Sequence, residues 1–109
     1  MNYILIEKPT MREAIKEMIK EGIRPLTIEE IWELRKEGKI KDQWYTAGTL
    51  WYQGKFQHIT FQQMKDIENI YADGGRLLCL GDLGYGGLVS NYDLDYNARI
   101  LGEKVRRRT

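Results

Sequence analysis

The chain has 109 residues, of which 42% are hydrophobic and 30% are charged, and its formal net charge is +1. This length and balance are typical of one soluble globular domain, and no apolar stretch is long enough to cross a bilayer, so a membrane-spanning segment is excluded and no membrane partner is expected. The single cysteine, Cys79, excludes an internal disulfide and any metal site built on several thiolates. We expect one domain at residues 1–105, a basic tail at 106–109 and no cofactor. Residues 1–8 show no secretory signal, which predicts a cytoplasmic protein.

Three Thr-x-x-Glu or Thr-x-x-Gln motifs mark the expected helix starts. In such a capping box the threonine hydroxyl accepts a hydrogen bond from a backbone N–H of the first turn, and the third residue after it reaches back. Apolar residues at helical spacing follow each motif. The motifs lie at residues 10–13, 27–30 and 60–63, and the helices are expected to end at Gly22, at Gly38 and at Gly74-Gly75.

The other apolar segments predict strands. Residues 3–6 form a short β-branched run, expected to be a strand buried on both faces. The dipeptide Gln53-Gly54 predicts a two-residue turn that pairs Tyr52 with Lys55 and Trp51 with Phe56 across a hairpin. Further strands are expected at residues 76–80, 88–89 and 98–105.

These elements follow the order β-α-α-β-β-α-β-β-β. The strands cluster and do not alternate with the helices. This order therefore predicts an α+β fold with three helices packed on a mainly antiparallel sheet.

Function is expected in the segment without caps, at residues 81–97. Its glycines form neither a Walker loop nor a dinucleotide fingerprint, because no Gly-Lys-Ser/Thr follows and Val89 occupies the place of the third glycine. Exposed tyrosines on a tight loop offer contact area at low entropic cost, so we expect a non-enzymatic surface that binds a partner protein or a second copy of the chain. The residues of this expected surface are Tyr85, Tyr92, Tyr96, Gly84, Gly86 and Gly87.

Two alternative functions remain open. The only concentrated positive charge lies at the C-terminus and predicts contact with nucleic acid; its residues are Lys104, Arg106, Arg107 and Arg108. The second alternative is a small metal-assisted enzyme that uses the oxygen ligands of Asp82, Asp93 and Asp95. An EF-hand is not formed, because Tyr96 occupies the glycine position and no glutamate closes the loop.

The segment at residues 22–30, Gly-Ile-Arg-Pro-Leu-Thr-Ile-Glu-Glu, resembles a block in small prokaryotic and phage proteins. In those proteins Arg-Pro-x-Thr and a helix precede a strand with glycine and tryptophan and a terminal strand of the Arg-Phe-Leu type, matched here by residues 48–51 and 99–101. The resemblance implies a C-type-lectin-like fold whose first and last strands pair, and a viral, archaeal or bacterial source. It implies no ligand residues, because the Glu-Pro-Asn and Trp-Asn-Asp triplets are missing and the helix at residues 60–71 is extra. Abundant lysine and glutamate in i,i+4 pairs further predict a thermophilic source.

Overall fold

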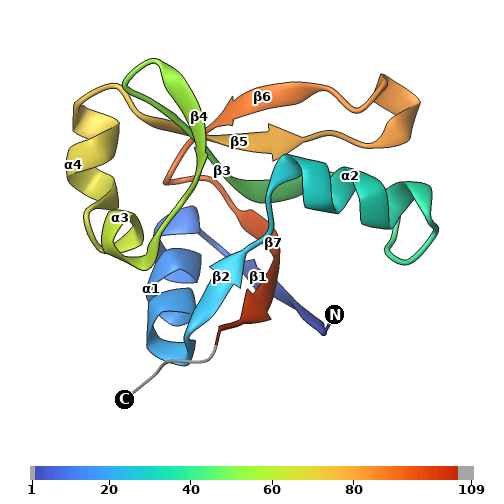
Figure 1. Cartoon of the computed structure of the whole chain (residues 1–109), viewed down its shortest axis with the longest axis horizontal. Coiled ribbons are helices and arrows are strands. Elements are labelled where there is room, and N and C mark those ends of the chain that lie inside the picture. The colour runs from blue at the N-terminus through green and yellow to red at the C-terminus, as the bar shows by residue number, and fades with distance from the viewer. Residues whose placement is uncertain (1, 106–109) are drawn as a thin grey trace.

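Helices cover both faces of a seven-stranded mixed sheet in the computed structural model, which describes residues 2–105 (Figure 1). The sheet order is β1-β7-β3-β5-β6, with β2 also paired to β7 and β4 also paired to β3. The fold is α+β, as predicted. In chain order the elements are β1 (Tyr3–Lys8), α1 (Met11–Glu21), β2 (Ile23–Pro25), α2 (Ile28–Lys36), β3 (Tyr45–Tyr52), β4 (Lys55–His58), α3 (Phe61–Lys65), α4 (Ile67–Ala72), β5 (Arg76–Leu80), the 3-10 turn η1 (Leu83–Tyr85), β6 (Val89–Tyr92) and β7 (Ala98–Lys104).

The three capping motifs start helices where the sequence predicts them. The hydroxyls of Thr27 and Thr60 each accept from the backbone N–H three residues on, and the backbone N–H of each threonine donates to the side-chain oxygen of that same residue. Thr10 accepts from Glu13 N at 3.1 Å. The prediction of one helix after Thr60 was wrong, because the chain departs from helical geometry at Asp66 and continues as a separate helix, α4.

The predicted hairpin is confirmed. Tyr52 pairs with Lys55 and Trp51 with Phe56, and the two aromatic rings lie 4.6 Å apart. Gln53 and Gly54 both have positive φ, at 52° and 78°, as the favoured two-residue hairpin turn requires.

No strand was predicted between the first two helices, yet β2 forms there and pairs antiparallel with β7. The Arg24 guanidinium donates to the Ile59 carbonyl at 3.0 Å and thereby holds β2 to the chain after β4. Gly48 permits the close approach of β3, because a Cβ at that position would lie 2.6 Å from the Pro25 carbonyl oxygen. The segment is therefore a strand through contacts with parts of the chain distant in sequence.

The two edge strands also differ from expectation. β1 was expected to be buried on both faces, but its only partner among the described strands is β7, and Ile4 and Leu5 are 37% and 47% exposed. At the other edge, the strand expected at residues 88–89 extends through Tyr92. The pairing of β1 with β7 does join the first and last strands, as the lectin-like resemblance implies.

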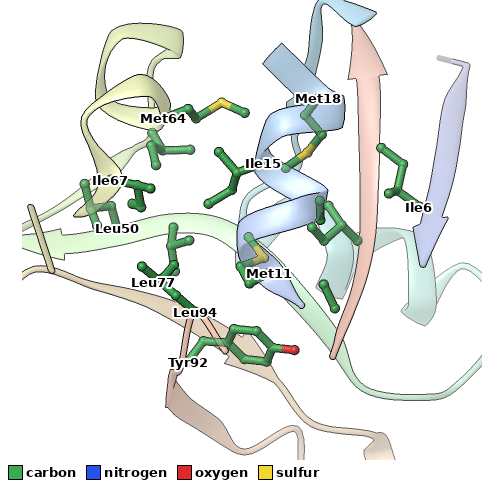
Figure 2. Close-up of a cluster of buried hydrophobic side chains, with 14 of the residues drawn as sticks. Ile6, Met11, Ile15, Met18, Leu50, Met64, Ile67, Leu77, Tyr92 and Leu94 are labelled. Carbon is green, nitrogen blue, oxygen red and sulfur yellow. The ribbon is translucent and has the colours of Figure 1, made fainter. Parts of the chain in front are cut away.

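Two hydrophobic clusters lie on opposite faces of the sheet. The larger cluster packs α1, α3 and α4 against the sheet, and Figure 2 shows Met11, Ile15 and Met18 of α1 directed into it. The smaller cluster packs α2 on the other face. It contains Leu26, Ile31, Tyr45, Ala47, Leu80 and Leu101. The molecule therefore has three layers, with the β5–β6 hairpin at one edge of the central sheet.

Candidate functional site

The β5–β6 hairpin divides the predicted tyrosine surface between its two ends. Leu80 pairs with Val89 beside the glycine-rich loop, whereas Leu77 pairs with Tyr92 at the far end. Tyr85 lies in the loop and is 72% exposed, but Tyr92 is buried at 6%. The structure thus places Tyr85 apart from Tyr92, and Tyr92 is not the exposed side chain that the sequence predicts.

The glycine-rich loop is explained by its own turn geometry. The Asp82 carboxylate accepts from Tyr85 N at 3.1 Å, and Gly87 N donates to the Asp82 carbonyl at 3.0 Å. Gly86 and Gly87 have positive φ, and a Cβ on Gly87 would lie 2.3 Å from the Trp32 ring of α2. The loop is therefore fixed against α2, and Gly87 is the glycine that permits this packing.

A hollow of about 380 Å³ lies at the other end of the hairpin. The Tyr92 ring stands 6.5 Å from the Trp44 ring and 6.1 Å from the Tyr96 ring, the latter in an edge-to-face arrangement. We call this site the aromatic hollow. Its lining residues are Trp44, Cys79, Ser90, Asn91, Tyr92, Asp93 and Tyr96.

The turn that carries Tyr96 is anchored to the first turn of α1. Met11 N donates to the Tyr96 carbonyl at 2.8 Å, and Arg12 N donates to the Leu94 carbonyl at 3.1 Å. These bonds satisfy two N–H groups that a helix start leaves unpaired. The Arg12 guanidinium also pairs with Asp95. Tyr96 is 61% exposed on this fixed turn, so its ring is available for contact.

Trp44 is held in place by Arg99. The guanidinium lies 4.5 Å from the centre of the indole ring, within cation–π distance, and its Nη1 donates to the Trp44 carbonyl at 3.2 Å. Sequence reasoning missed Trp44. Nothing near it in the chain marks it as a site residue, because its ring contact with Tyr92 joins parts of the chain that are distant in sequence.

A second hollow, of about 240 Å³, adjoins the aromatic hollow and shares Asn91, Tyr92 and Asp93 with it. Tyr71 lines its other side, where the tyrosine hydroxyl donates to the Tyr92 carbonyl at 2.6 Å and accepts from Leu77 N at 3.0 Å. Burial raises the pKa of Tyr71 to about 12. Tyr71 therefore stays protonated and positions the end of β6.

The side chains of Cys79, His58 and Tyr92 do not form a catalytic pair. Burial raises the pKa of the Cys79 thiol to about 11, so the reactive thiolate is scarce at neutral pH. His58 Nε2 lies 2.7 Å from the Pro25 carbonyl, to which it must donate. Burial also raises the pKa of the Tyr92 hydroxyl, and the nearby Thr46 hydroxyl partly offsets this rise. No activated nucleophile is therefore found among these residues.

The three aspartates proposed as metal ligands do not converge. Asp82 lies at the loop end of the hairpin, whereas Asp93 and Asp95 lie beyond its other end. Asp93 Oδ1 accepts from Asp95 N at 2.9 Å, and Asp95 pairs with Arg12. Within residues 2–105 no group of three or more histidine, cysteine, aspartate or glutamate side chains could hold a metal ion.

Most of the proposed nucleic-acid residues lie outside the part of the chain that the structure describes. Lys104 is the last residue of β7 and is exposed, while Arg106, Arg107 and Arg108 lie outside the described residues. The described chain contains no helix with the length and hydropathy needed to cross a membrane.

Comparison of this chain with models of protein families, with curated protein sequences and with solved structures found no match.

Proposed function

We propose that this protein is a non-enzymatic binding module that holds a segment of a partner protein in the aromatic hollow. The observation that carries the proposal is the grouping of Trp44, Tyr92 and Tyr96 around one opening with Ser90, Asn91 and Asp93 in its lining. Binding sites typically combine such an apolar, aromatic lining with a few convergent polar groups.

The aromatic side chains suit partner binding for two reasons. Tyrosine and tryptophan bury large areas while losing few rotameric states, and they dominate the energetics of many interfaces. Trp44 and the turn that carries Tyr96 are already fixed, by Arg99 and by the start of α1 respectively. A partner therefore meets a preorganised surface and loses less free energy to ordering.

The backbone of β6 indicates how such a segment binds. Gly81 N donates to the Leu88 carbonyl at 2.6 Å, so in the alternating ladder the backbone groups of Ser90 and Tyr92 also face β5. Those of Val89 and Asn91 face away from β5, at the open edge of the sheet. An extended segment of a partner can pair with this edge and place an apolar side chain in the hollow beside it.

The proposal predicts a difference between two exposed tyrosines at opposite ends of the hairpin. A library of short random peptides is selected on the wild-type protein, and the dissociation constant of each enriched peptide is then measured by calorimetry. We expect Tyr96→Ala to weaken binding at least about tenfold, the usual effect of removing a central aromatic contact. Tyr85→Ala is the matched control and should bind with unchanged affinity. Selection of no peptide, or equal binding by Tyr96→Ala, contradicts the proposal.

The nucleic-acid alternative makes a different prediction. If the basic C-terminal residues bind DNA or RNA, affinity falls steeply with added salt and is lost when residues 104–109 are removed. Such binding, unaffected by Tyr96→Ala, would favour the alternative over a protein partner. A cytoplasmic location and a thermophilic, viral or archaeal source remain predictions from the sequence.

A further inference from the structure

Among the described residues, the backbone of β1 has no pairing partner along one side. Leu26 N donates to the Leu101 carbonyl at 2.8 Å, and Val105 N donates to the Gly22 carbonyl at 2.9 Å, so odd-numbered residues of β7 direct their backbone groups toward β2. Even-numbered residues of β7 therefore face β1 on the other side. In the observed register these even residues pair with Ile4, Ile6 and Lys8.

The backbone N–H and C=O groups of Tyr3, Leu5 and Glu7 consequently point away from the sheet. Within residues 2–105, no backbone or side-chain hydrogen bond reaches them from another element. An open edge with exposed apolar side chains, here Ile4 and Leu5, is a template for pairing with another strand.

We propose that β1 pairs with β1 of a second copy of this chain, antiparallel about a two-fold axis through Leu5. In this register Leu5 lies opposite Leu5 of the second copy, and Tyr3 lies opposite Glu7 at either end. Each outward-facing pair exchanges two hydrogen bonds, so the three pairs make six. The interface is isologous and closes after two subunits.

The strand's own sequence favours this register. A shift of the axis to Glu7 would set two glutamates directly opposite each other and would bring Pro9, which has no N–H, into the ladder. A shift to Ile4 or Ile6 would use only two of the three outward-facing residues of β1. The axis at Leu5 uses all three and places no like charges face to face.

Charge around the edge also favours a second copy. A hollow of about 300 Å³ runs between β1 and the second half of α1, and its lining includes Ile4, Lys8, Glu17 and Glu21. Lys8 pairs with Glu17 of its own chain at 2.9 Å. In the proposed register Lys8 of the second copy lies opposite Asn2, next to Ile4, and so brings a positive charge to the side of the hollow that Glu21 borders.

The proposed pairing through β1 and the proposed partner binding at β6 do not interfere with each other. β1 and β6 stand at opposite ends of the sheet order. Pairing through β1 therefore leaves the aromatic hollow accessible in both subunits. A single strand pair buries little surface, so a reversible, concentration-dependent dimer is expected.

Sedimentation velocity over about a hundredfold range of protein concentration tests the pairing. We expect the wild-type protein to pass from monomer to dimer. Leu5→Lys should remain monomeric at every concentration, because a charge at the centre of an edge pair opposes its partner copy. Val89→Lys, at the other open edge, is the matched control and should dimerise as the wild type does. Thermal unfolding verifies that both variants fold.

Backbone amide hydrogen exchange gives an independent measure of the register. The amides of Tyr3, Leu5 and Glu7 should be protected at high protein concentration and exchange at low concentration. The amides of Ile4, Ile6 and Lys8 should be protected at both, since they bond to β7. A monomeric wild type, a dimer that persists in Leu5→Lys, or outward amides that exchange equally at both concentrations overturns the proposal.

Discussion

Gly87 allows the glycine-rich loop to pack against α2 because it has no side chain. Its φ of 68° lies in the left-handed region, and a Cβ there would contact the Trp32 ring at 2.3 Å. We expect Gly87→Ala to lower the free energy of unfolding by about 2–4 kcal/mol through backbone strain and overpacking combined. Urea unfolding measures this loss.

Gly86→Ala is the control for the backbone contribution. Gly86 has a φ of 72°, but a Cβ there would meet nothing within 4 Å. Strain alone should cost about 1–2 kcal/mol. Equal losses in the two variants would show that the contact between Gly87 and Trp32 does not hold the loop against α2.

Arg12 makes the stability of the site dependent on pH. Its hydrogen bond holds the pKa of Glu68 below the ordinary value, and the same guanidinium pairs with Asp95 beside Tyr96. Because the folded-state pKa of Glu68 is the lower one, the stabilisation is complete above the unfolded-state pKa. It is lost as the pH falls through the folded-state pKa.

The measurement compares wild type with Arg12→Met. Carboxyl resonances followed by NMR should give a higher pKa for Glu68 in the variant, and the difference in stability between the two proteins should shrink as the pH is lowered. Lys65→Met removes an exposed charge on α3 and should leave the Glu68 titration unchanged. If the difference in stability grew toward acid pH, the pH dependence could not be assigned to the hydrogen bond between Arg12 and Glu68.

At the scale of elements, a helix or strand is predicted correctly when the contacts that determine it lie between residues close in sequence. The Gln53-Gly54 hairpin and the starts of α1, α2 and α3 depend on neighbouring residues, and the sequence shows them directly. β2 depends on β7 and on the small side chain of Gly48, which a local pattern does not contain. The break at Asp66 was missed because the apolar spacing continues across it.

The candidate site follows the same rule. Tyr96 could be found from its place in a polar segment, and it does line the hollow. The alternation of Tyr92, Leu94 and Tyr96 does not reveal that the first two are buried and the third is exposed, since the turn bonded to α1 sets their directions. Trp44 joins them only through a ring contact with Tyr92, which is distant from it in sequence.

The close packing of β2 on β3 predicts a sharp effect at Gly48. A Cβ there would lie 2.6 Å from the Pro25 carbonyl oxygen, a backbone atom that cannot rotate away. Gly48→Ala should lower the free energy of unfolding by about 2–4 kcal/mol, as overpacking does in a core. Gly102→Ala would meet mainly the Ile23 side chain, at 2.4 Å, and its loss should be smaller because that side chain can move. Urea unfolding of both variants shows which one loses more free energy of unfolding.

At the scale of the whole molecule, the three layers leave two open edges with different chemistry. The β6 edge borders the aromatic hollow and is proposed to bind a partner segment, while the β1 edge is apolar and self-complementary and is proposed to bind a second copy. α1 connects the two regions, because its first turn fixes the Tyr96 turn and its second half borders the β1 hollow.

The central claim is that a partner segment binds in the aromatic hollow. The most direct test compares the amide chemical shifts of the isotope-labelled protein with and without a peptide enriched in the selection. The account predicts shifts at residues 89–96 and at the indole N–H of Trp44, with the loop at residues 83–87 unchanged. Shifts centred on residues 83–87 around Tyr85, with the Trp44 indole N–H unchanged, would contradict it.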